Sequence, residues 1–241
     1  MQRIDDLQIR DLKIIQDTDL FCFGTDAVLL AHFPKIKRKA KVADLGVGSG
    51  ILMLLLYAQM PEAKYFGIEI QEELYKLAQR NIKLNNLEKH LSVYCGNIKN
   101  AFDILGTDFD LAVSNPPYEK FDEGKPRENI SHLTARKEVE ITFEELAESV
   151  RRILKTGGHF CLIHKVRRLA EVIFTLKKNK LEPKRLRFIH SKADKPAVYV
   201  LIESVKDGKE HLEVLPPLIL YDENGRESAE LKQIYGNTDE N

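Results

Sequence analysis

An apolar strand and a glycine-rich loop meet in residues 41–50, KVADLGVGSG. The run from Lys41 to Leu45 has the character of a strand buried in a parallel sheet, and residues 51–59 after the loop predict a helix. Glycines at such a strand-to-helix turn let the backbone approach a ligand closely. The stretch therefore predicts an α/β fold with a ligand bound where the first core strand ends.

The spacing of the glycines indicates which cofactor this loop holds. A dinucleotide-binding loop would have its third glycine at position 51, which is Ile51 here, whereas this chain has Gly50. That spacing favours S-adenosylmethionine over NAD. We predict a cofactor site that includes Asp44, Gly46, Gly48 and Gly50.

Two later strand ends carry polar side chains that suit the same cofactor. The predicted strand of residues 64–70 ends near Glu69, whose carboxylate can accept hydrogen bonds from both ribose hydroxyls. A solvent-facing acid is the alternative for Glu69, but its apolar neighbours on both sides weaken it. The predicted strand of residues 91–95 leads to Asn97. Because the carboxyl ends of parallel strands meet at one edge of the sheet, we expect Glu69 and Asn97 to line the cleft of the glycine loop.

A fourth strand end carries the predicted catalytic residues. Residues 109–114, FDLAVS, predict a buried strand, and Asn115-Pro116-Pro117-Tyr118 follows it. The prolines fix φ, so they hold the Asn115 amide and the Pro116 carbonyl in one rigid, outward-facing arrangement. Two hydrogen-bond acceptors and an aromatic ring suit a planar exocyclic amine such as adenine N6. The alternative is a proline turn that only ends a strand, and the glycine loop upstream favours the catalytic interpretation.

We expect an N-terminal cover of residues 1–40, a core of residues 41–205 and a C-terminal extension of residues 206–241, which together form one domain. In the cover, Thr25 or Asp26 is expected to cap a short helix, and in an alternative role Asp26 belongs to the cofactor site. We expect residues 103–106 to be a connection and residues 119–137 to be a mobile loop over the cleft. The remaining predicted helices are residues 71–85, 143–154 with a C-cap at Gly157-Gly158, and 167–179, and the remaining predicted strands are residues 159–164, 185–191, 197–203 and 212–215.

The charge of the chain is balanced as a whole but uneven along its length. The 241 residues carry 37 basic and 37 acidic side chains, which argues against a globally basic nucleic-acid binder. Between positions 165 and 195, however, eleven Lys or Arg residues face only three acids. This segment predicts an RNA-binding face, although a solvated helix would have the same composition. The expected phosphate contacts are Arg167, Arg168, Arg185 and Arg187.

Composition also indicates the cellular compartment of the protein. Three well-separated cysteines without CxxC spacing fit the reduced thiols of a cytoplasmic protein. We expect no membrane association, because the start has no apolar signal segment and the longest apolar run, residues 51–58, is too short to span a bilayer. No cluster of His, Cys and carboxylates has metal-ligand spacing, so no metal is expected. The oligomeric state stays open.

In combination, the glycine loop, Glu69 and the Asn-Pro-Pro-Tyr turn resemble those of class I S-adenosylmethionine-dependent methyltransferases. More narrowly, residues 24–30, GTDAVLL, with 135–138, ARKE, and 181–185, LEPKR, resemble the bacterial tRNA1(Val) (adenine(37)-N6)-methyltransferase family, and the similarity runs over most of the chain. The resemblance implies a Rossmann-like, seven-stranded, mostly parallel sheet with an antiparallel last strand. It also implies methylation of the tRNA adenosine 3′ of the anticodon.

Carried over by position, the resemblance implies that the glycines hold the methionine part of the cofactor, Glu69 its ribose and Asn97 its adenine. Many relatives have Asp at the position of Asn97, so we expect weaker cofactor binding here, because an amide oxygen is an uncharged acceptor. Two alternatives stay open. The turn would equally hold a protein glutamine N5 or an rRNA guanine N2, since both amines present two N–H groups. The other alternative is a noncatalytic RNA-binding module with a relic cofactor fold.

Overall fold

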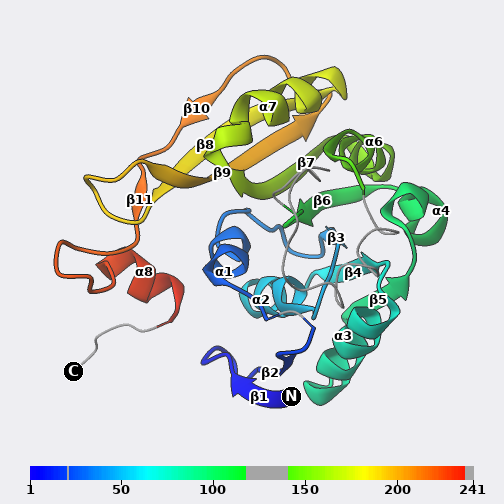
Figure 1. The fold of residues 1–241 in the computed structure, drawn as a ribbon. Coiled ribbons are helices and arrows are strands. Elements are labelled where there is room, and N and C mark those ends of the chain that lie inside the picture. Colours follow the sequence, from blue (N-terminus) through cyan, green and yellow to red (C-terminus); the bar gives the residue numbers. More distant parts are fainter. Residues whose placement is uncertain (21, 118–140, 237–241) are drawn as a thin grey trace, which may run out of the picture.

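A nine-stranded sheet forms the centre of the computed structural model, which describes residues 1–20, 22–117 and 141–236 (Figure 1). Its long strands are β3 Lys41–Leu45, β4 Lys64–Glu69, β5 Leu91–Cys95, β6 Phe109–Ser114, β7 Leu154–Lys165, β8 Leu181–His190 and β9 Ala197–Lys206. They lie side by side in the order β5-β4-β3-β6-β7-β9-β8. Two short strands, β10 Glu213–Val214 and β11 Leu218–Ile219, pair with β8 at the edge.

All the long strands except β9 run in one direction. The pairs β3–β4, β4–β5, β3–β6 and β6–β7 are parallel, whereas β9 lies antiparallel between β7 and β8. The prediction of a mostly parallel, seven-stranded sheet with an antiparallel last strand is therefore confirmed. The predicted strand of residues 212–215 is the short strand β10, and β10 and β11 extend the sheet beyond its seven long strands.

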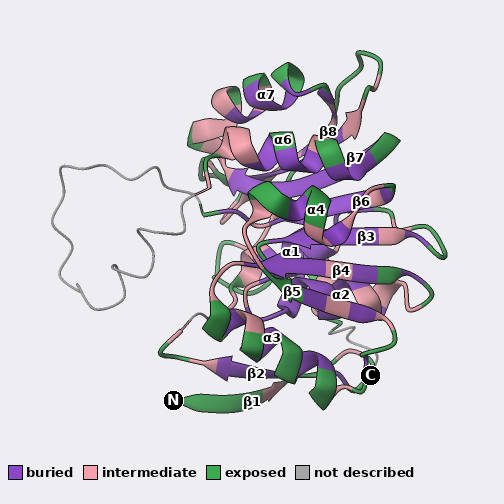
Figure 2. Ribbon diagram, turned by 90° about the vertical axis from the view of Figure 1, so that its right-hand side faces the viewer, coloured by how far each residue is buried: buried purple, intermediate pink, exposed green. Residues whose placement is uncertain are grey.

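Helices cover both faces of the sheet (Figures 1 and 2). One face packs against α1 Thr25–Ala31, α2 Ile51–Gln59 and α3 Glu72–Leu84, and the other against α4 Ala101–Leu105, α6 Phe143–Ile153 and α7 Leu169–Lys178. Tyr65 lies in the core on the first face and Phe160 in the core on the second, and both are fully buried. Strands buried on both sides read as near-continuous apolar runs, which is why the sequence predicted them.

The two ends of the chain pack against the first face and its helices. Near the N-terminus, β1 Gln2–Asp6 and β2 Lys13–Asp17 form an antiparallel hairpin, and β2 packs on α3 (Figure 2). In this segment, Leu12, Ile14 and Ile15 are all buried. Near the C-terminus, helix α8 Ala229–Ile234 buries Leu231 completely against the same core.

Some predicted boundaries are wrong. Residues 103–106 are not a plain connection, because α4 follows the 3-10 helix η1 Ile98–Asn100 without a gap. Gly157 and Gly158 do not cap α6, since β7 begins at Leu154 and contains both glycines. They lie where the pairing of β7 with β6 shifts register, and a side chain at Gly158 would come within 2.9 Å of the Phe109 carbonyl oxygen. The glycines thus allow a strand irregularity.

Other boundaries differ by a few residues. The predicted helix of residues 167–179 is the 3-10 helix η3 Val166–Arg168 followed by α7, and β8 begins at Leu181, four residues before the prediction. The predicted loop of residues 119–137 lies outside the described residues. Within the described part of the chain, no helix is long and apolar enough to cross a membrane.

Candidate active site

The predicted catalytic turn, of which Asn115, Pro116 and Pro117 are described, and the glycine loop follow neighbouring strands of the sheet. Asp44 of β3 is paired with Val113 of β6 in parallel register, so Gly46 and Asn115 follow at the same level. The buried Ser114 hydroxyl donates a hydrogen bond of 2.7 Å to the Leu45 carbonyl, which ties the two strand ends together. Adjacent strands lie about 4.8 Å apart. The structure therefore brings Asn115 and the glycine loop together as predicted.

The rest of the catalytic turn is described only in part. Asn115 is half-buried, Pro116 is buried and Pro117 is exposed. Tyr118, the predicted stacking residue, lies outside the described residues.

The glycine loop has a backbone that only glycine adopts readily. Gly46, Gly48 and Gly50 have φ values of +90°, +56° and +90°. A Cβ atom added at Gly48 would have no other atom within 4 Å, and one at Gly46 would meet only Ile98, at 3.9 Å. These two glycines therefore border open space that a ligand can occupy.

Glu69 is held by the backbone of this loop. Its Oε2 accepts a hydrogen bond from the Gly48 N–H at 2.9 Å, and its Oε1 accepts one from the Gln71 N–H at 2.9 Å. Burial raises the pKa of Glu69, and these backbone N–H groups oppose that shift without cancelling it. Each oxygen keeps a second lone pair, so the carboxylate is oriented and still able to accept from ribose hydroxyls.

Asp44 is the most deeply buried acid of the site. Its side chain is 2% exposed, and neither of its oxygens has a hydrogen-bond partner among the described residues. Burial and the nearby charge of Glu69 raise its pKa to about 8. A buried carboxyl group without a partner is costly, so it suits a site that receives a cationic ligand.

Asn97 and Asp26 have local backbone roles that the sequence did not fully predict. Asn97 Oδ1 accepts a hydrogen bond from the Lys99 N–H at 2.9 Å and caps η1. The expected cap of α1 by Thr25 or Asp26 is wrong, because Gly24 is the N-cap residue. Asp26 lies in the first turn and accepts from the Ala27 N–H at 2.9 Å, where a negative charge is favourable.

Gly67 was missed as a site residue. It lies inside β4, and a Cβ atom there would come within 2.3 Å of Val47 Cγ2 and 2.8 Å of Met53 Sδ. The glycine thus lets the cofactor loop and the start of α2 pack on the sheet. The signal was present in the sequence, since a glycine in a strand often marks a close approach.

Asn81 was missed as well. It lies on the buried face of α3 and is fully buried. Its amide donates hydrogen bonds to the Ser49 carbonyl at 2.8 Å and the Ile15 carbonyl at 3.1 Å, and its Oδ1 accepts from the Ile15 N–H at 2.6 Å. Asn81 therefore connects the N-terminal hairpin to the glycine loop. An Asn among the apolar positions of a helix was the available signal.

The predicted arginine contacts are mostly engaged inside the protein. Arg185 forms an ion pair with the buried Glu203, and its guanidinium carbon lies 4.8 Å from the centroid of the Phe33 ring. Burial would raise the pKa of Glu203, but hydrogen bonds from His159 and Arg185 outweigh it and lower that pKa. The side chain of Arg185 is only 18% exposed. Arg185 is thus a structural residue, and its prediction as a phosphate contact is wrong.

Arg187 and Arg168 are also paired. Arg187 contacts both carboxylate oxygens of Glu230, at 2.7 and 2.8 Å, and donates to the Pro216 carbonyl at 3.1 Å. Arg168 forms an ion pair of 3.0 Å with Glu171 and is 15% exposed. Of the four predicted arginines, only Arg167 is exposed.

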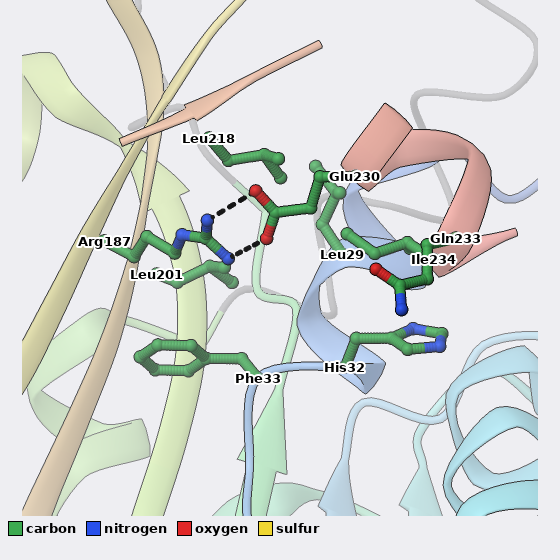
Figure 3. Close-up of a pocket in the computed structure, with 9 residues that line it drawn as sticks. All are labelled: Leu29, His32, Phe33, Arg187, Leu201, Leu218, Glu230, Gln233 and Ile234. Atoms are coloured by element: carbon green, nitrogen blue, oxygen red, sulfur yellow. Dashed lines mark hydrogen bonds and ion pairs between the residues drawn. The ribbon is translucent and has the colours of Figure 1, made fainter. Parts of the chain in front are cut away.

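The Arg187–Glu230 pair borders a cavity of about 290 Å³ (Figure 3). The cavity lies between α1, the sheet and α8, and none of the predicted cofactor or catalytic residues lines it. Its lining residues are Leu29, His32, Phe33, Arg187, Leu201, Leu218, Glu230, Gln233 and Ile234. Among the described residues, no group of three or more His, Cys, Asp or Glu side chains could hold a metal ion.

Comparisons with known proteins agree with this geometry. A family model described as "Methyltransferase small domain" matches residues 13–179. The tRNA1(Val) (adenine(37)-N6)-methyltransferase of Pectobacterium carotovorum is 27% identical over 236 residues, covering 96% of this chain and 92% of that protein. The protein of the same name from Actinobacillus succinogenes is 30% identical over 215 residues, covering 88% and 87%.

Among solved structures, a predicted O-methyltransferase from Agrobacterium tumefaciens has a TM-score of 0.71 at 22% identity, covering 88% of this chain and 96% of that one, which shows a shared fold. The family model and the extent of the sequence similarity together show that the chain belongs to the methyltransferase small domain family, as a class I S-adenosylmethionine-dependent methyltransferase of the tRNA1(Val) (adenine(37)-N6)-methyltransferase family.

Proposed function

We propose that this enzyme transfers a methyl group from S-adenosylmethionine to N6 of an adenine in tRNA, the adenosine 3′ of the anticodon. The observation that carries the proposal is the position of Asn115 beside the glycine loop, fixed by the hydrogen bond between Ser114 and Leu45. A methyl donor on the loop and an amine held at the turn then lie on adjacent strand ends. The names of the relatives supply the substrate.

The residues of the cleft fit the cofactor. The open space beside Gly46 and Gly48 would take its methionine part, and a sulfonium cation bound there would favour ionisation of the buried Asp44 and Glu69 carboxyl groups, whose pKa values are raised in its absence. The second lone pairs of Glu69 would accept from the ribose hydroxyls. Asn97 would hold the adenine, and Asp26 the amino-acid end. Bound there, S-adenosylmethionine supplies an electrophilic methyl group.

The catalytic turn would act on the target amine by positioning and polarisation. Asn115 Oδ1 and the Pro116 carbonyl would each accept a hydrogen bond from one N–H group of N6. These two hydrogen bonds would turn the nitrogen lone pair out of conjugation with the ring and toward the cofactor. These contacts strengthen as the amine becomes tetrahedral, so they favour the transition state over the ground state. The aromatic ring of Tyr118 would suit stacking on the unpaired base, a type of contact worth about 1–3 kcal/mol. No covalent enzyme intermediate is required.

Product analysis tests the substrate directly. The enzyme is incubated with methyl-labelled S-adenosylmethionine and, separately, with tRNA, rRNA and protein fractions, and the labelled fraction is digested and analysed by mass spectrometry. We expect N6-methyladenosine from tRNA. If the labelled methyl group were found on guanine N2 or on protein glutamine, the substrate of the enzyme would be that amine and not adenine N6. Cofactor binding by calorimetry without transfer to any fraction would favour the noncatalytic alternative.

The role of the turn is tested by Asn115→Ala. We expect turnover to fall by about 10²–10³-fold, the usual effect of losing one preorganised hydrogen-bond partner. Cofactor affinity, measured by calorimetry, should stay at the wild-type value, because Asn115 is assigned to the amine. Asn224→Ala, at an exposed position near the C-terminus, is the matched control. Turnover of Asn115→Ala within a few-fold of this control would remove Asn115 from the mechanism.

A further inference from the structure

Two groups among the basic residues of segment 165–195 differ in where they lie in the structure. Arg185 and Arg187 project from the middle of β8 and are neutralised by Glu203 and Glu230. The other group lies at the ends of the strands. It comprises Lys165 at the end of β7, Arg167 just after that strand, and Lys192 and Lys195 in the connection from β8 to β9. We call these four residues the basic rim.

The topology places the basic rim at the same edge of the sheet as the catalytic turn. β7 is parallel to β6 with Ser114 opposite Leu162, so Lys165 follows shortly beyond the level of Asn115 on the adjacent strand. β8 and β7 both run antiparallel to β9, so the carboxyl end of β8 reaches this edge too. β8 lies three strands from β6, a lateral distance of about 14 Å. The rim thus extends sideways from the turn.

The rim is ordered by local contacts. The Lys165 ammonium lies 3.8 Å from the centroid of the Tyr199 ring, which faces it across the β7–β9 pair. His190 Nδ1 contacts the Lys195 carbonyl at 2.7 Å, and the Lys195 N–H donates to the Lys192 carbonyl at 3.1 Å. The Lys192 ammonium donates to the Glu223 carbonyl at 3.1 Å, so these contacts fix the backbone of the connection and the positions of two of the four cations.

Two acids of the described residues, Glu171 and Asp194, lie close to the rim in the sequence. Glu171 is paired with Arg168, which is not counted in the rim. Asp194 lies 3.4 Å from Lys195, but both side chains are well exposed, at 71% and 59%, and such surface pairs contribute little. Among the described residues at this edge, the four rim cations and Arg168 outnumber the acids Glu171 and Asp194, so this part of the described surface has a net positive charge.

From these observations we propose that the basic rim holds the phosphates of the RNA strand next to the target nucleotide, with Tyr199 as part of the same contact surface. This inference rests on the proposed function, because it assumes an RNA substrate whose base enters at Asn115. It replaces the earlier prediction that Arg168, Arg185 and Arg187 bind phosphates.

The chain contains a matched control surface. Lys35, Lys37, Arg38 and Lys39 are equally basic and all exposed, but they precede the amino end of β3. β3 has five residues, so this cluster lies about 17 Å from the catalytic edge along the strand direction. Removing four charges there changes the net charge of the protein as much as removing the rim does.

The test compares the variants K165Q/R167Q/K192Q/K195Q and K35Q/K37Q/R38Q/K39Q. Binding of a synthetic anticodon stem-loop RNA, with adenine 3′ of the anticodon, is measured by fluorescence anisotropy between about 50 and 200 mM salt. We expect the rim variant to flatten the slope of log K against log salt by about 0.7 per lost contact, and the control variant to keep the wild-type slope. A wild-type slope in the rim variant, or equal flattening in both, would overturn the proposal.

Two further measurements separate this inference from the proposed function. Both variants should bind S-adenosylmethionine as the wild type does, and the rim variant should methylate the stem-loop with a raised KM and nearly unchanged kcat. If the wild type methylates the stem-loop and the rim variant does so with an unchanged KM, the proposal for the rim is rejected and the proposed function stands. Absence of methylation by the wild type would reject the proposed function. K192Q/K195Q, confined to an exposed connection, serves if the fourfold variant does not fold.

Discussion

Asp44 carries a carboxyl group that folding withdraws from water. Its pKa rises from an ordinary acid value to about 8, since burial and the charge of Glu69 both disfavour ionisation. Between these values the folded protein keeps a proton that the unfolded chain has released. The contribution of Asp44 to stability therefore falls as the pH rises, and it stops changing above about pH 8.

We predict that Asp44→Asn gains stability relative to the wild type as the pH rises from about 5 to about 8, because the amide never has to ionise. The difference in the free energy of unfolding should grow by at most about 1.4 kcal/mol per pH unit and then level off. Denaturant titrations at a series of pH values measure it. Asp103→Asn, which changes an exposed acid, is the control. A difference that does not vary with pH would contradict a protonated Asp44 in the folded protein.

At the scale of residues, the local motifs were predictable and the long-range partners were not. Gly46, Gly48 and Asn115 belong to short sequence motifs, so their chemistry can be predicted from the residues next to them in the sequence. Asn81 acts through Ser49 and Ile15, which are 32 and 66 positions away, so its role depends on the completed fold. The pairing of Arg187 with Glu230, 43 positions apart, was hidden for the same reason.

At the scale of elements, helix α3 connects two parts of the molecule through Asn81. We predict that Asn81→Leu lowers the free energy of unfolding by about 3 kcal/mol, because the Ser49 carbonyl and both backbone groups of Ile15 lose buried partners. Affinity for S-adenosylmethionine should also fall, since the glycine loop loses an anchor. Chemical denaturation and calorimetry measure the two effects.

The control for this prediction is Gln79→Leu, an exposed position on the same helix. It should change the free energy of unfolding by no more than about 0.5 kcal/mol. If Asn81→Leu were as stable as this control and bound the cofactor normally, the hydrogen bonds of Asn81 to the hairpin and the glycine loop would contribute nothing to stability or to cofactor binding.

Element boundaries were predictable where an apolar run has clear ends. β3, α2, β5 and β6 begin and end at the predicted residues. Helix α4 was missed because its five residues are fewer than the helical periodicity needs to be recognised. The start of β7 was misplaced because Gly157-Gly158 also has the composition of a helix end, and only the pairing with β6 distinguishes the two.

At the scale of the whole molecule, the C-terminal extension is attached to the sheet through charge as well as burial. The Arg187 guanidinium and the Glu230 carboxylate join β8 to α8, and their side chains are 21% and 44% exposed. Leu231, the residue after Glu230, is fully buried in the core. The extension thereby covers α1, whose first residue, Thr25, accepts a hydrogen bond of 3.2 Å from the Tyr235 hydroxyl.

We predict that Glu230→Ala lowers the free energy of unfolding by about 1–2 kcal/mol, because a half-buried guanidinium loses both of its charged contacts. A double-mutant cycle with Arg187→Met should give a coupling energy of at least about 0.5 kcal/mol. Glu227→Ala, exposed in the same segment, is the matched control. Strictly additive effects of the two substitutions would show that the pair does not hold α8.

The antiparallel insertion of β9 also affects the order in which the chain can fold during its synthesis. β7 and β8 leave the ribosome before the strand that separates them, so the backbone groups of β7 that pair with β9 have no partner until residues 197–206 follow. At about 5–20 residues per second, that delay is about 2–8 s. An unpaired apolar strand edge promotes aggregation during such an interval. A nascent chain of this protein is therefore a candidate for chaperone binding at β7 until translation passes Lys206.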